Sequence, residues 1–265
     1  VKITDLDGTP TINSLGTGIQ TADYHYASAM AMSPDGDLYI GGYFESPGKF
    51  IAKWDGTSWS QLSTGLNNTV FALAFAPNGD LYIGGDFTDV YGASSNTYPY
   101  ICKWDGTSFS AVGTAGDING AVRTLVFDGA GLLYAGGDFT NAGGNAASDC
   151  LAVWTGTRWH AMPGGSPNDR VYRLFFEWSK QSKLYIAGAF TAVGDLSLTD
   201  RIAVWSNGAW QALDINLPGT SSVHSILPAS DGSLYLGGSF STAGETPDEN
   251  AETGIVALNL NVSSA

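Results

Sequence analysis

The sequence has 265 residues, of which 43% are hydrophobic and 14% are charged. This supply of apolar side chains is enough for a large core and excludes wholesale disorder. The 11 basic and 25 acidic residues give a net charge of −14, which argues against nucleic acid and anionic lipid as partners, because both require a basic surface. No apolar run is long enough to span a bilayer, so no membrane insertion is expected.

One phrase recurs five times along the chain and predicts its architecture. Each copy reads Leu-Tyr-x-Gly-Gly-x-Phe, with Ala for the first glycine in the fourth copy, and the second glycines are 43, 52, 51 and 50 residues apart. A repeat of this length without helical periodicity indicates propeller blades rather than a helical solenoid. The copies begin at Leu38, Leu81, Leu133, Leu184 and Leu234.

Each repeat is expected to form four short antiparallel strands, a to d in chain order. In the second repeat, strand a is 70–76, strand b is 81–87, strand c is 101–104, and strand d starts at Phe109. The Asn-Gly or Asp-Gly pairs between strands a and b supply the positive φ that tight hairpins require. The Gly-Gly pair lowers the strand propensity of strand b, so we expect neighbouring backbone or an aromatic ring to approach closely there.

The predicted fold is therefore all-β, a single five-bladed β-propeller over residues 1–265. The tail 255–258 aligns with strand c, and the head 1–18 aligns with a c–d hairpin. We expect both chain ends to close the last blade, the tail as strand c and the head as strand d. The predicted blades are roughly 23–65, 66–115, 116–165, 166–215, and 216–260 together with 1–18.

A second phrase, Ile51-Ala-Lys-Trp-Asp-Gly-Thr-Ser-Trp59, follows the first copy, and related phrases follow the next three. Together, LYIGGxF and IAxWDGTxW resemble the Gly-Gly-x-Phe/Trp-Asp-Gly propeller repeats of secreted bacterial and phage proteins. They are also similar to the repeats of the fungal cortical-marker proteins and, more distantly, to kelch repeats. The resemblance implies a binding or structural module, because such repeats serve mostly in those roles.

Two sets of side chains are candidates for ligand binding. The first set lies in or beside the long b–c and d–a connections, which share one face of the predicted blades. Tyrosines among small polar residues suit contact with sugars or protein surfaces, although the same side chains could only cap the blade edges. The set consists of Tyr24, His25, Tyr26, Tyr91, Tyr98 and Tyr100.

The second set occupies one repeat position near the start of strand a. The next two positions on the same side of that strand are uniformly apolar, whereas this layer varies. Such variation is typical of a ligand-facing rim, and it is also what a solvated strand end produces. The layer consists of Ser28, Phe71, Arg123, Tyr172 and His224. Its last three members are the candidate binding residues.

Catalytic and metal sites find less support in the sequence. Strand a offers only Asp128 and Glu177 as carboxylates, and no recurring pair suits glycoside hydrolysis. No nucleophile motif or phosphate-binding loop is present, so we predict that the chain is not an enzyme. We also predict no cofactor and no metal. Asp86 and Asp138 are weak candidates for Ca²⁺, and turn capping is the commoner role of such residues.

The predicted function is that of a non-catalytic extracellular module for adhesion or assembly, at a cell surface or on a virion such as a phage tail. Few lysines and Asn/Ser/Thr-rich loops favour an exported protein, and the start at Val1 favours a processed or excised chain. The expected partner is a protein or glycan surface, and self-assembly or incorporation into a larger fibre is a further alternative. A lectin-like propeller is the second reading, and a glycoside hydrolase or lyase is the third. Cys102 and Cys150 are expected to be unpaired.

Overall fold

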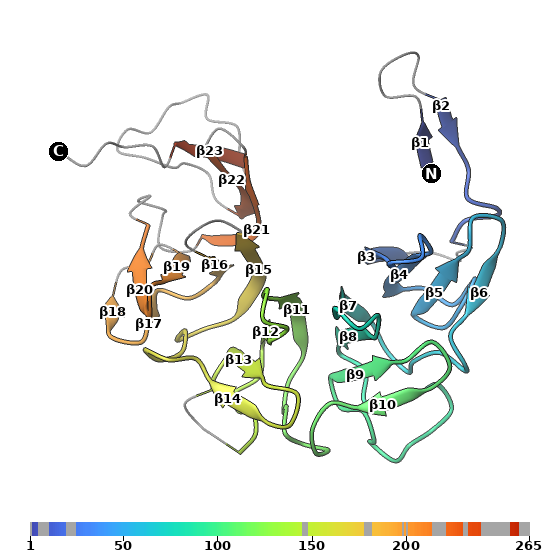
Figure 1. Ribbon diagram of the computed structural model, residues 1–265, viewed down its shortest axis with the longest axis horizontal. Coiled ribbons are helices and arrows are strands. Elements are labelled where there is room, and N and C mark those ends of the chain that lie inside the picture. The colour runs from blue at the N-terminus through green and yellow to red at the C-terminus, as the bar shows by residue number, and fades with distance from the viewer. Residues whose placement is uncertain are drawn as a thin grey trace. The chain divides into compact units, whose positions relative to one another are not determined.

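The structure, a computed structural model, describes residues 2–4, 11–19, 25–144, 148–177, 182–197, 199, 201–213, 221–229, 233–239 and 255–259. The chain divides into two compact units, Val1–Ala115 and Gly116–Ala265, and each is described by itself. The division falls at the expected junction between the second and third repeats. All the described elements are β-strands (Figure 1), and no described segment forms a helix that could cross a membrane.

The first unit contains two four-stranded antiparallel sheets, β3-β4-β5-β6 and β7-β8-β9-β10, and the separate pair β1-β2. Both larger sheets have the expected a-b-c-d strand order. Their strands are β3 (Tyr26–Met32), β4 (Leu38–Tyr43), β5 (Ile51–Trp54), β6 (Trp59–Gln61), β7 (Val70–Phe75), β8 (Leu81–Gly85), β9 (Ile101–Trp104) and β10 (Phe109–Ala111). The separate pair is β1 (Lys2–Thr4) and β2 (Thr11–Asn13).

The second unit repeats this order in β11-β12-β13-β14 and β15-β16-β19-β20, followed by the three-stranded sheet β21-β22-β23 and the hairpin β17-β18. The strands of the two four-stranded sheets are β11 (Val122–Phe127), β12 (Leu133–Gly137), β13 (Leu151–Trp154), β14 (Trp159–Ala161), β15 (Val171–Glu177), β16 (Lys183–Gly188), β19 (Ile202–Ser206) and β20 (Ala209–Ala212). The others are β17 (Ala192–Val193), β18 (Leu196–Ser197), β21 (Ser222–Pro228), β22 (Ser233–Ser239) and β23 (Ile255–Asn259).

The chain ends agree in part with the expected closure of the last blade. The tail strand β23 pairs with β22, so the tail supplies strand c as predicted. The head forms the hairpin β1-β2, in which Ile3 is paired with Ile12, and the described sheet of β21, β22 and β23 has no fourth strand. Closure by the head, and with it a ring of five blades, stays a prediction.

The two glycines of strand b have different close neighbours, and only the second meets the neighbouring backbone that the sequence predicted. A Cβ on Gly136 would lie 2.7 Å from a methyl group of Val171 on the next inner strand. A Cβ on Gly137 would overlap the carbonyl oxygen of Ala121, which enters strand a of the same sheet. Because both approaches are closer than van der Waals contact, a larger residue would push the strands apart at these positions.

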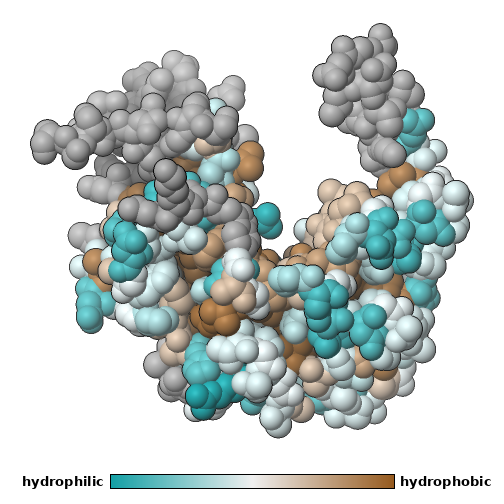
Figure 2. Space-filling view, in the orientation of Figure 1, coloured by the Kyte–Doolittle hydropathy of each residue, from teal (hydrophilic) through white to brown (hydrophobic). Residues whose placement is uncertain are grey.

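Apolar side chains seal the sheets against one another within each unit. In the first unit, Tyr39 and Ile51 of one sheet belong to the same buried cluster as Leu81 and Ile83 of the next. The phenylalanines that end the repeated phrase are fully buried in four copies: Phe44, Phe87, Phe139 and Phe190. By contrast, the surface over the outer strands β5, β6, β9 and β10 carries mostly hydrophilic and intermediate residues (Figure 2).

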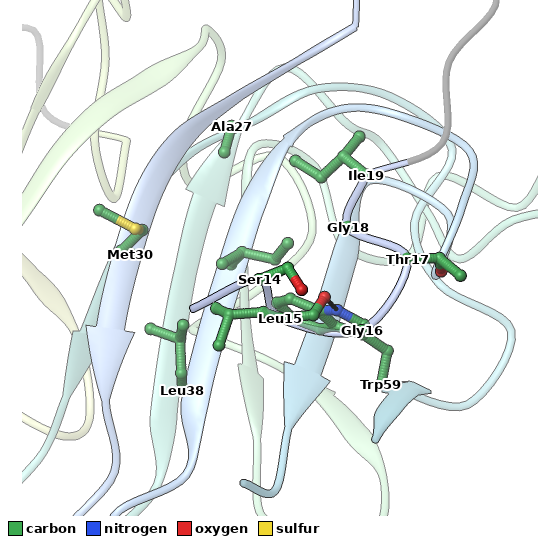
Figure 3. Close-up of a pocket in the computed structure, with 11 residues that line it drawn as sticks. Ser14, Leu15, Gly16, Thr17, Gly18, Ile19, Ala27, Met30, Leu38 and Trp59 are labelled. Atoms are coloured by element: carbon green, nitrogen blue, oxygen red, sulfur yellow. Dashed lines mark hydrogen bonds between the residues drawn. The ribbon is translucent and has the colours of Figure 1, made fainter. Parts of the chain in front are cut away.

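Two of the aromatic pairs of strands c and d, Trp54/Trp59 and Trp205/Trp210, are covered by the connection that precedes their sheet. The Trp59 indole N–H donates to the Leu15 carbonyl oxygen at 2.8 Å (Figure 3), and the Trp210 indole N–H donates to the Gly165 carbonyl oxygen at 3.1 Å. Gly16 lies close to the Trp54 ring, as Gly164 lies close to the Trp205 ring. The rings in the four pairs are 4.7–5.3 Å apart: Trp54/Trp59, Trp104/Phe109, Trp154/Trp159 and Trp205/Trp210.

Both cysteines are free and buried, as expected. Cys102 occupies the position of Ala52, Ala152 and Ala203, where each side chain is fully enclosed. Burial raises the pKa of the Cys102 thiol well above its ordinary value. Burial, with a smaller contribution from nearby aspartates, raises the pKa of Cys150 to about 12. Neither thiol is therefore a good nucleophile at neutral pH.

Candidate binding site on the inner strands

A β-bulge occurs at the same place in all five inner strands. The pairing of strand a with strand b skips one residue between Ala27/Ala29, Val70/Ala72, Val122/Thr124, Val171/Arg173 and Val223/Ser225. The skipped residues are the variable layer of the sequence: Ser28, Phe71, Arg123, Tyr172 and His224. A bulge leaves its extra residue without a partner in the backbone pairing of the two strands and redirects its side chain. Sequence reasoning located the layer but attributed it to a rim or a strand end.

In the second unit, three of these residues form a continuous stack, which we call the ladder. The inner strands β11, β15 and β21 lie side by side there (Figure 1). The Arg123 guanidinium carbon is 5.5 Å from the centre of the Tyr172 ring. The Tyr172 ring stacks on the His224 ring at 4.7 Å, with 7° between the planes. The sequence placed these residues in one layer, and the structure brings their side chains together.

Asp138 and Ser239, at the end of strand b in their sheets, hold the two ends of the ladder together with Ser222 of β21. Arg123 donates through Nε and Nη2 to the two carboxylate oxygens of Asp138, each at 2.6 Å. At the other end, His224 Nε2 lies 2.8 Å from Ser222 Oγ and 3.3 Å from Ser239 Oγ. Two parallel charged hydrogen bonds fix the plane of the guanidinium, so Arg123 meets Tyr172 in a single orientation.

Asp138 and Ser239 share one repeat position, the variable residue of the Gly-Gly-x-Phe phrase. Sequence reasoning treated this position as a metal candidate and missed its pairing with the bulge residue. A usable signal was present in the sequence, because the two positions carry complementary side chains: aspartate with Arg123, and serine with His224. In the first unit, Asp86 of this position accepts from the Asn68 side-chain amide at 3.2 Å instead.

The bulges of the first unit carry no charge. Ser28 donates through its hydroxyl to the Val70 carbonyl oxygen at 2.5 Å, which ties one inner strand to the next. Phe71 is half-buried. The same backbone defect thus serves packing in one unit and presents polar and aromatic groups in the other.

Two of the predicted aromatic residues gather around Tyr43, which sequence reasoning did not select. His25 and Tyr26 lie 5.4 Å and 6.2 Å from the Tyr43 ring centre. Tyr26 is 50% exposed and Tyr43 is 42% exposed, so this cluster offers aromatic surface to solvent. Tyr24 lies outside the described residues.

Tyr91 is also exposed and belongs to the loop between β8 and β9. The Lys49 ammonium lies 4.5 Å from the centre of its ring and pairs with Glu45 at 3.1 Å. Asp89 stabilises the loop, because its buried carboxylate accepts a hydrogen bond from the Ser95 hydroxyl at 2.6 Å. Hydrogen bonds from Ser95 and from backbone N–H groups outweigh burial and lower the pKa of Asp89, so this buried group stays charged.

Tyr98 and Tyr100 support the same loop rather than extending from it. The Tyr98 hydroxyl donates to the Phe109 carbonyl oxygen at 3.4 Å, and its ring packs against the core of the unit. Tyr100 has a φ of 66°, and its N–H donates to the Phe87 carbonyl oxygen at 2.8 Å while its carbonyl oxygen accepts from the Gly85 N–H at 3.0 Å. Edge capping, the alternative weighed for the tyrosines, agrees with the side-chain contacts of Tyr98, and a binding role for either residue stays a prediction.

In three sheets, an asparagine before strand a is hydrogen-bonded to a threonine after strand b. The asparagine amide donates to the threonine hydroxyl, and its carbonyl oxygen accepts the threonine backbone N–H, at 2.9–3.1 Å. The pairs are Asn67/Thr88, Asn119/Thr140 and Asn168/Thr191. Sequence reasoning missed them, although a threonine follows the phrase in each of these copies.

The carboxylates considered for catalysis serve the a–b hairpins. Asp128 accepts from the backbone N–H groups of Ala130 and Leu132 at 2.9 Å and 2.8 Å, and from the Tyr134 hydroxyl at 3.2 Å. Glu177 accepts from the Tyr185 hydroxyl at 3.0 Å. Burial, followed by the Asp128 carboxylate, raises the pKa of Tyr134 to about 12.

The weak Ca²⁺ candidates have other partners. Both Asp138 oxygens are engaged by Arg123, and Asp86 accepts from Asn68. In the part of the chain that the structure describes, no three metal-ligating side chains come together. Whether the chain binds a metal or cofactor is untested, and the expectation of none stays a prediction.

No protein-family model matches the sequence, and no curated protein matches it. Among solved structures, a catalytically inactive virginiamycin B lyase from Staphylococcus aureus with quinupristin is 13% identical, with a TM-score of 0.53 over 98% of this chain and 77% of its own. The extracellular domain of a one-component system from B. thetaiotaomicron is 16% identical, with a TM-score of 0.49 over 82% of this chain and 26% of its own. The WD40 β-propeller domain of Doa1 is 13% identical, with a TM-score of 0.46 over 83% of this chain and 64% of its own.

The chain thus spans about a quarter of that extracellular domain and just under two thirds of the WD40 domain. Together with the repeated antiparallel sheets, the likeness to the lyase shows that the chain has a propeller repeat fold. At 13% identity it shows the fold alone. The resemblance to kelch-like and Gly-Gly-x-Phe families stays a prediction.

The prediction that the chain is not an enzyme needs correction. It rested on missing motifs and on the usual roles of similar repeats, whereas a lyase has this fold over 98% of the chain. The physical reason is that inner strands far apart in sequence can bring reactive side chains together without leaving a local motif, as they do for Arg123, Tyr172 and His224. The architecture is therefore no argument against catalysis.

Proposed function

We propose that the chain is an extracellular binding module that docks a partner protein on the ladder and the loops around it. The observation that carries this proposal is the stack of Arg123, Tyr172 and His224, three bulge residues from three different strands. Tyrosine and arginine are the residue types that dominate binding energy at protein interfaces. The serines and Asp138 hold the stack in place, so little ordering free energy is lost when a partner binds.

An exported or virion-surface location, with adhesion or assembly as the role, is part of this proposal. Few lysines and many polar loop residues support it. The loops of the second unit that join strands b and c would add contacts around the ladder, since they are anchored by the Asn119/Thr140 and Asn168/Thr191 pairs.

We propose further that the propeller has five blades and that the head supplies the missing strand of the last one. In the second unit, strand β14 leads into the connection 162–165, which covers Trp210. In the first unit, β2 leads into the connection 14–18, which covers Trp59 in the same way. By this analogy β2 is strand d of a preceding blade, and the sheet β21-β22-β23 is the one that lacks a strand d.

The test of the main proposal is binding to an array of extracellular and cell-surface proteins, followed by affinity measurement for any partner found. The triple variant Arg123→Ala/Tyr172→Ala/His224→Ala should weaken that partner by at least about 100-fold, since each of two or more central side chains contributes about 2 kcal/mol. Ser28→Ala/Phe71→Ala, which changes the equivalent layer of the first unit, is the matched control and should change affinity little. A partner that binds the triple variant as tightly as the wild type would contradict the proposal.

Glycan binding is a second candidate, and the exposed cluster of Tyr26 and Tyr43 favours it. Aromatic rings offered to solvent suit the apolar faces of sugars. A glycan array would decide between the two candidates: saturable binding that is lost in Tyr26→Ala/Tyr43→Ala and kept in the ladder variant would favour the lectin.

A lyase-type reaction at the ladder is a further candidate, favoured by the fold shared with virginiamycin B lyase and by the exposed imidazole of His224. An imidazole is the commonest side chain for proton transfer near neutral pH. Loss of quinupristin over time, followed by mass spectrometry in the wild type and in His224→Ala, tests it. No turnover by the wild type would remove quinupristin as a substrate.

A further inference from the structure

Arginines border the ladder in a chain whose net charge is −14. All five arginines of the sequence lie between residues 123 and 201. Arg123 is a rung of the ladder, Arg170 enters strand β15, and Arg173 follows Tyr172 directly in the same bulge. At physiological ionic strength charges are screened within about 8 Å, so these neighbours matter more to a ligand here than the acidic surface elsewhere.

The three arginines differ in how far their hydrogen-bond donors are used. Arg123 is committed to both oxygens of Asp138. Arg170 approaches the same carboxylate only to 3.9 Å, and its side chain is 55% exposed, although a hydrogen bond with the Tyr172 hydroxyl, followed by the Asp138 charge, raises its pKa. Arg173 is exposed and belongs to none of the ion pairs of the described residues.

The acidic groups nearby leave these donors available. Asp138 is shared between two guanidinium groups. Asp169 accepts its neighbour's backbone N–H at 2.7 Å through Oδ1. Since Arg173 has a planar fork of donors and no described carboxylate to fill it, an incoming carboxylate could be bound bidentately there.

The end of the stack is open as well. One face of the His224 ring is covered by Tyr172, and the residue as a whole is exposed. Nε2 is held between Ser222 and Ser239, which restrains rotation of the ring. A planar group of a ligand could therefore continue the stack on the other face.

We propose that the ladder binds an acidic segment of a protein partner, with a carboxylate on Arg173, supported by Arg170, and a planar side chain or peptide group on His224. This inference rests on the proposed function and narrows it to one chemical class of partner segment. An acidic glycan could present the same carboxylate, but the planar platform at His224 favours a peptide, which carries planar amide and aromatic groups.

The test uses two acetylated, amidated tetrapeptides, Tyr-Asp-Glu-Tyr and its uncharged counterpart Tyr-Asn-Gln-Tyr, titrated into the full chain by fluorescence anisotropy. The acidic peptide should bind at least about tenfold more tightly than the neutral one, since charged hydrogen bonds are about twice as strong as neutral ones. Arg173→Gln should remove that preference. Arg158→Gln is the matched control, because Arg158 is an exposed arginine of the β13–β14 turn, hydrogen-bonded to His160, and it should change nothing.

Equal affinity for both peptides, or a preference that survives in Arg173→Gln, would overturn the inference. So would binding of a glucuronic acid oligosaccharide when neither peptide binds. The two proposals fail differently: a partner that is lost in the ladder triple variant but is insensitive to Arg173→Gln refutes only the acidic segment. A partner that ignores the triple variant refutes the docking site itself.

Discussion

The two units of the molecule share one backbone plan and use it differently. In the first unit, a lysine of strand c forms an ion pair with the aspartate that precedes strand b. The pairs are Lys53 with Asp37 at 2.6 Å and Lys103 with Asp80 at 2.8 Å. In the second unit, the lysine positions are Val153 and Val204, which are buried. The bulges differ too, since those of the first unit carry Ser28 and Phe71 and those of the second carry the ladder.

The comparison separates positions that the fold requires from positions that are free to acquire a function. The Gly-Gly pair of strand b and the buried phenylalanines recur in both units. Neighbouring strands pack so closely against these positions that other residue types do not fit. The bulge residue and the residue that it contacts at the end of strand b vary between sheets. They can do so because a bulge residue lies outside the regular backbone pairing of the sheet. Function is therefore to be sought at the bulges of the second unit.

The largest expected effect is one that should not distinguish the units. Phe87→Ala and Phe139→Ala each remove a fully buried ring and should each lower the free energy of unfolding by about 3–5 kcal/mol. Chemical denaturation measures both. A loss below about 1 kcal/mol in either variant would mean that the site repacks, and that the two units do not share the same core.

Asp138→Ala and Asp86→Ala should separate the units. Asp138 holds Arg123 with two hydrogen bonds, so its loss should cost about 1–2 kcal/mol, reduced by partial exposure of the pair. Asp86 is exposed, and its loss should cost less than about 0.5 kcal/mol. Equal effects in the two variants would show that the Arg123 pair contributes no more than a surface contact.

Lys53→Val gives the first unit the residue type that the second unit has at this position. Replacing a partly exposed ion pair by an apolar residue should change the free energy of unfolding by less than about 1 kcal/mol. The hydrogen bond to Asp37 raises the pKa of Lys53, so the wild-type contribution is present below pH 10.5 and is lost as pH rises through the folded pKa. Denaturation of wild type and variant at pH 7 and pH 11 should therefore show a smaller difference at pH 11.

The last prediction concerns Tyr134 of the second unit, whose contribution changes only at high pH. Its pKa is raised to about 12 from 10.0, chiefly by burial, so the folded state holds its proton more tightly than the unfolded chain does. Stability should decline between pH 10 and pH 12, and Tyr134→Phe should reduce that decline. Melting temperatures of wild type and variant across this range measure it, and parallel curves would contradict the assignment.

Much of the fold could be predicted because it is written in repeated local patterns. The strand order, the close approach at Gly136 and Gly137, and the pairing of the tail 255–259 with β22 all follow from phrases that recur in register. The bulges were not predicted, because strand a carries apolar residues on both faces, so that the spacing of three between the buried Val171 and Leu174 does not stand out in the sequence. The Asn168/Thr191 type of contact was missed for another reason, since its partners lie 23 residues apart and polar pairs leave no hydrophobic periodicity.

Hydrogen–deuterium exchange with the acidic tetrapeptide bound tests most directly whether the second unit carries the binding site. Bulge residues lie outside the regular backbone pairing of the sheet, so their amides should respond to a ligand that covers them. The account predicts slower exchange in peptides that contain Arg123, Tyr172 and His224, and no change in those that contain Ser28 and Phe71. Protection confined to the Ser28 and Phe71 strands, with none at the ladder, would contradict it.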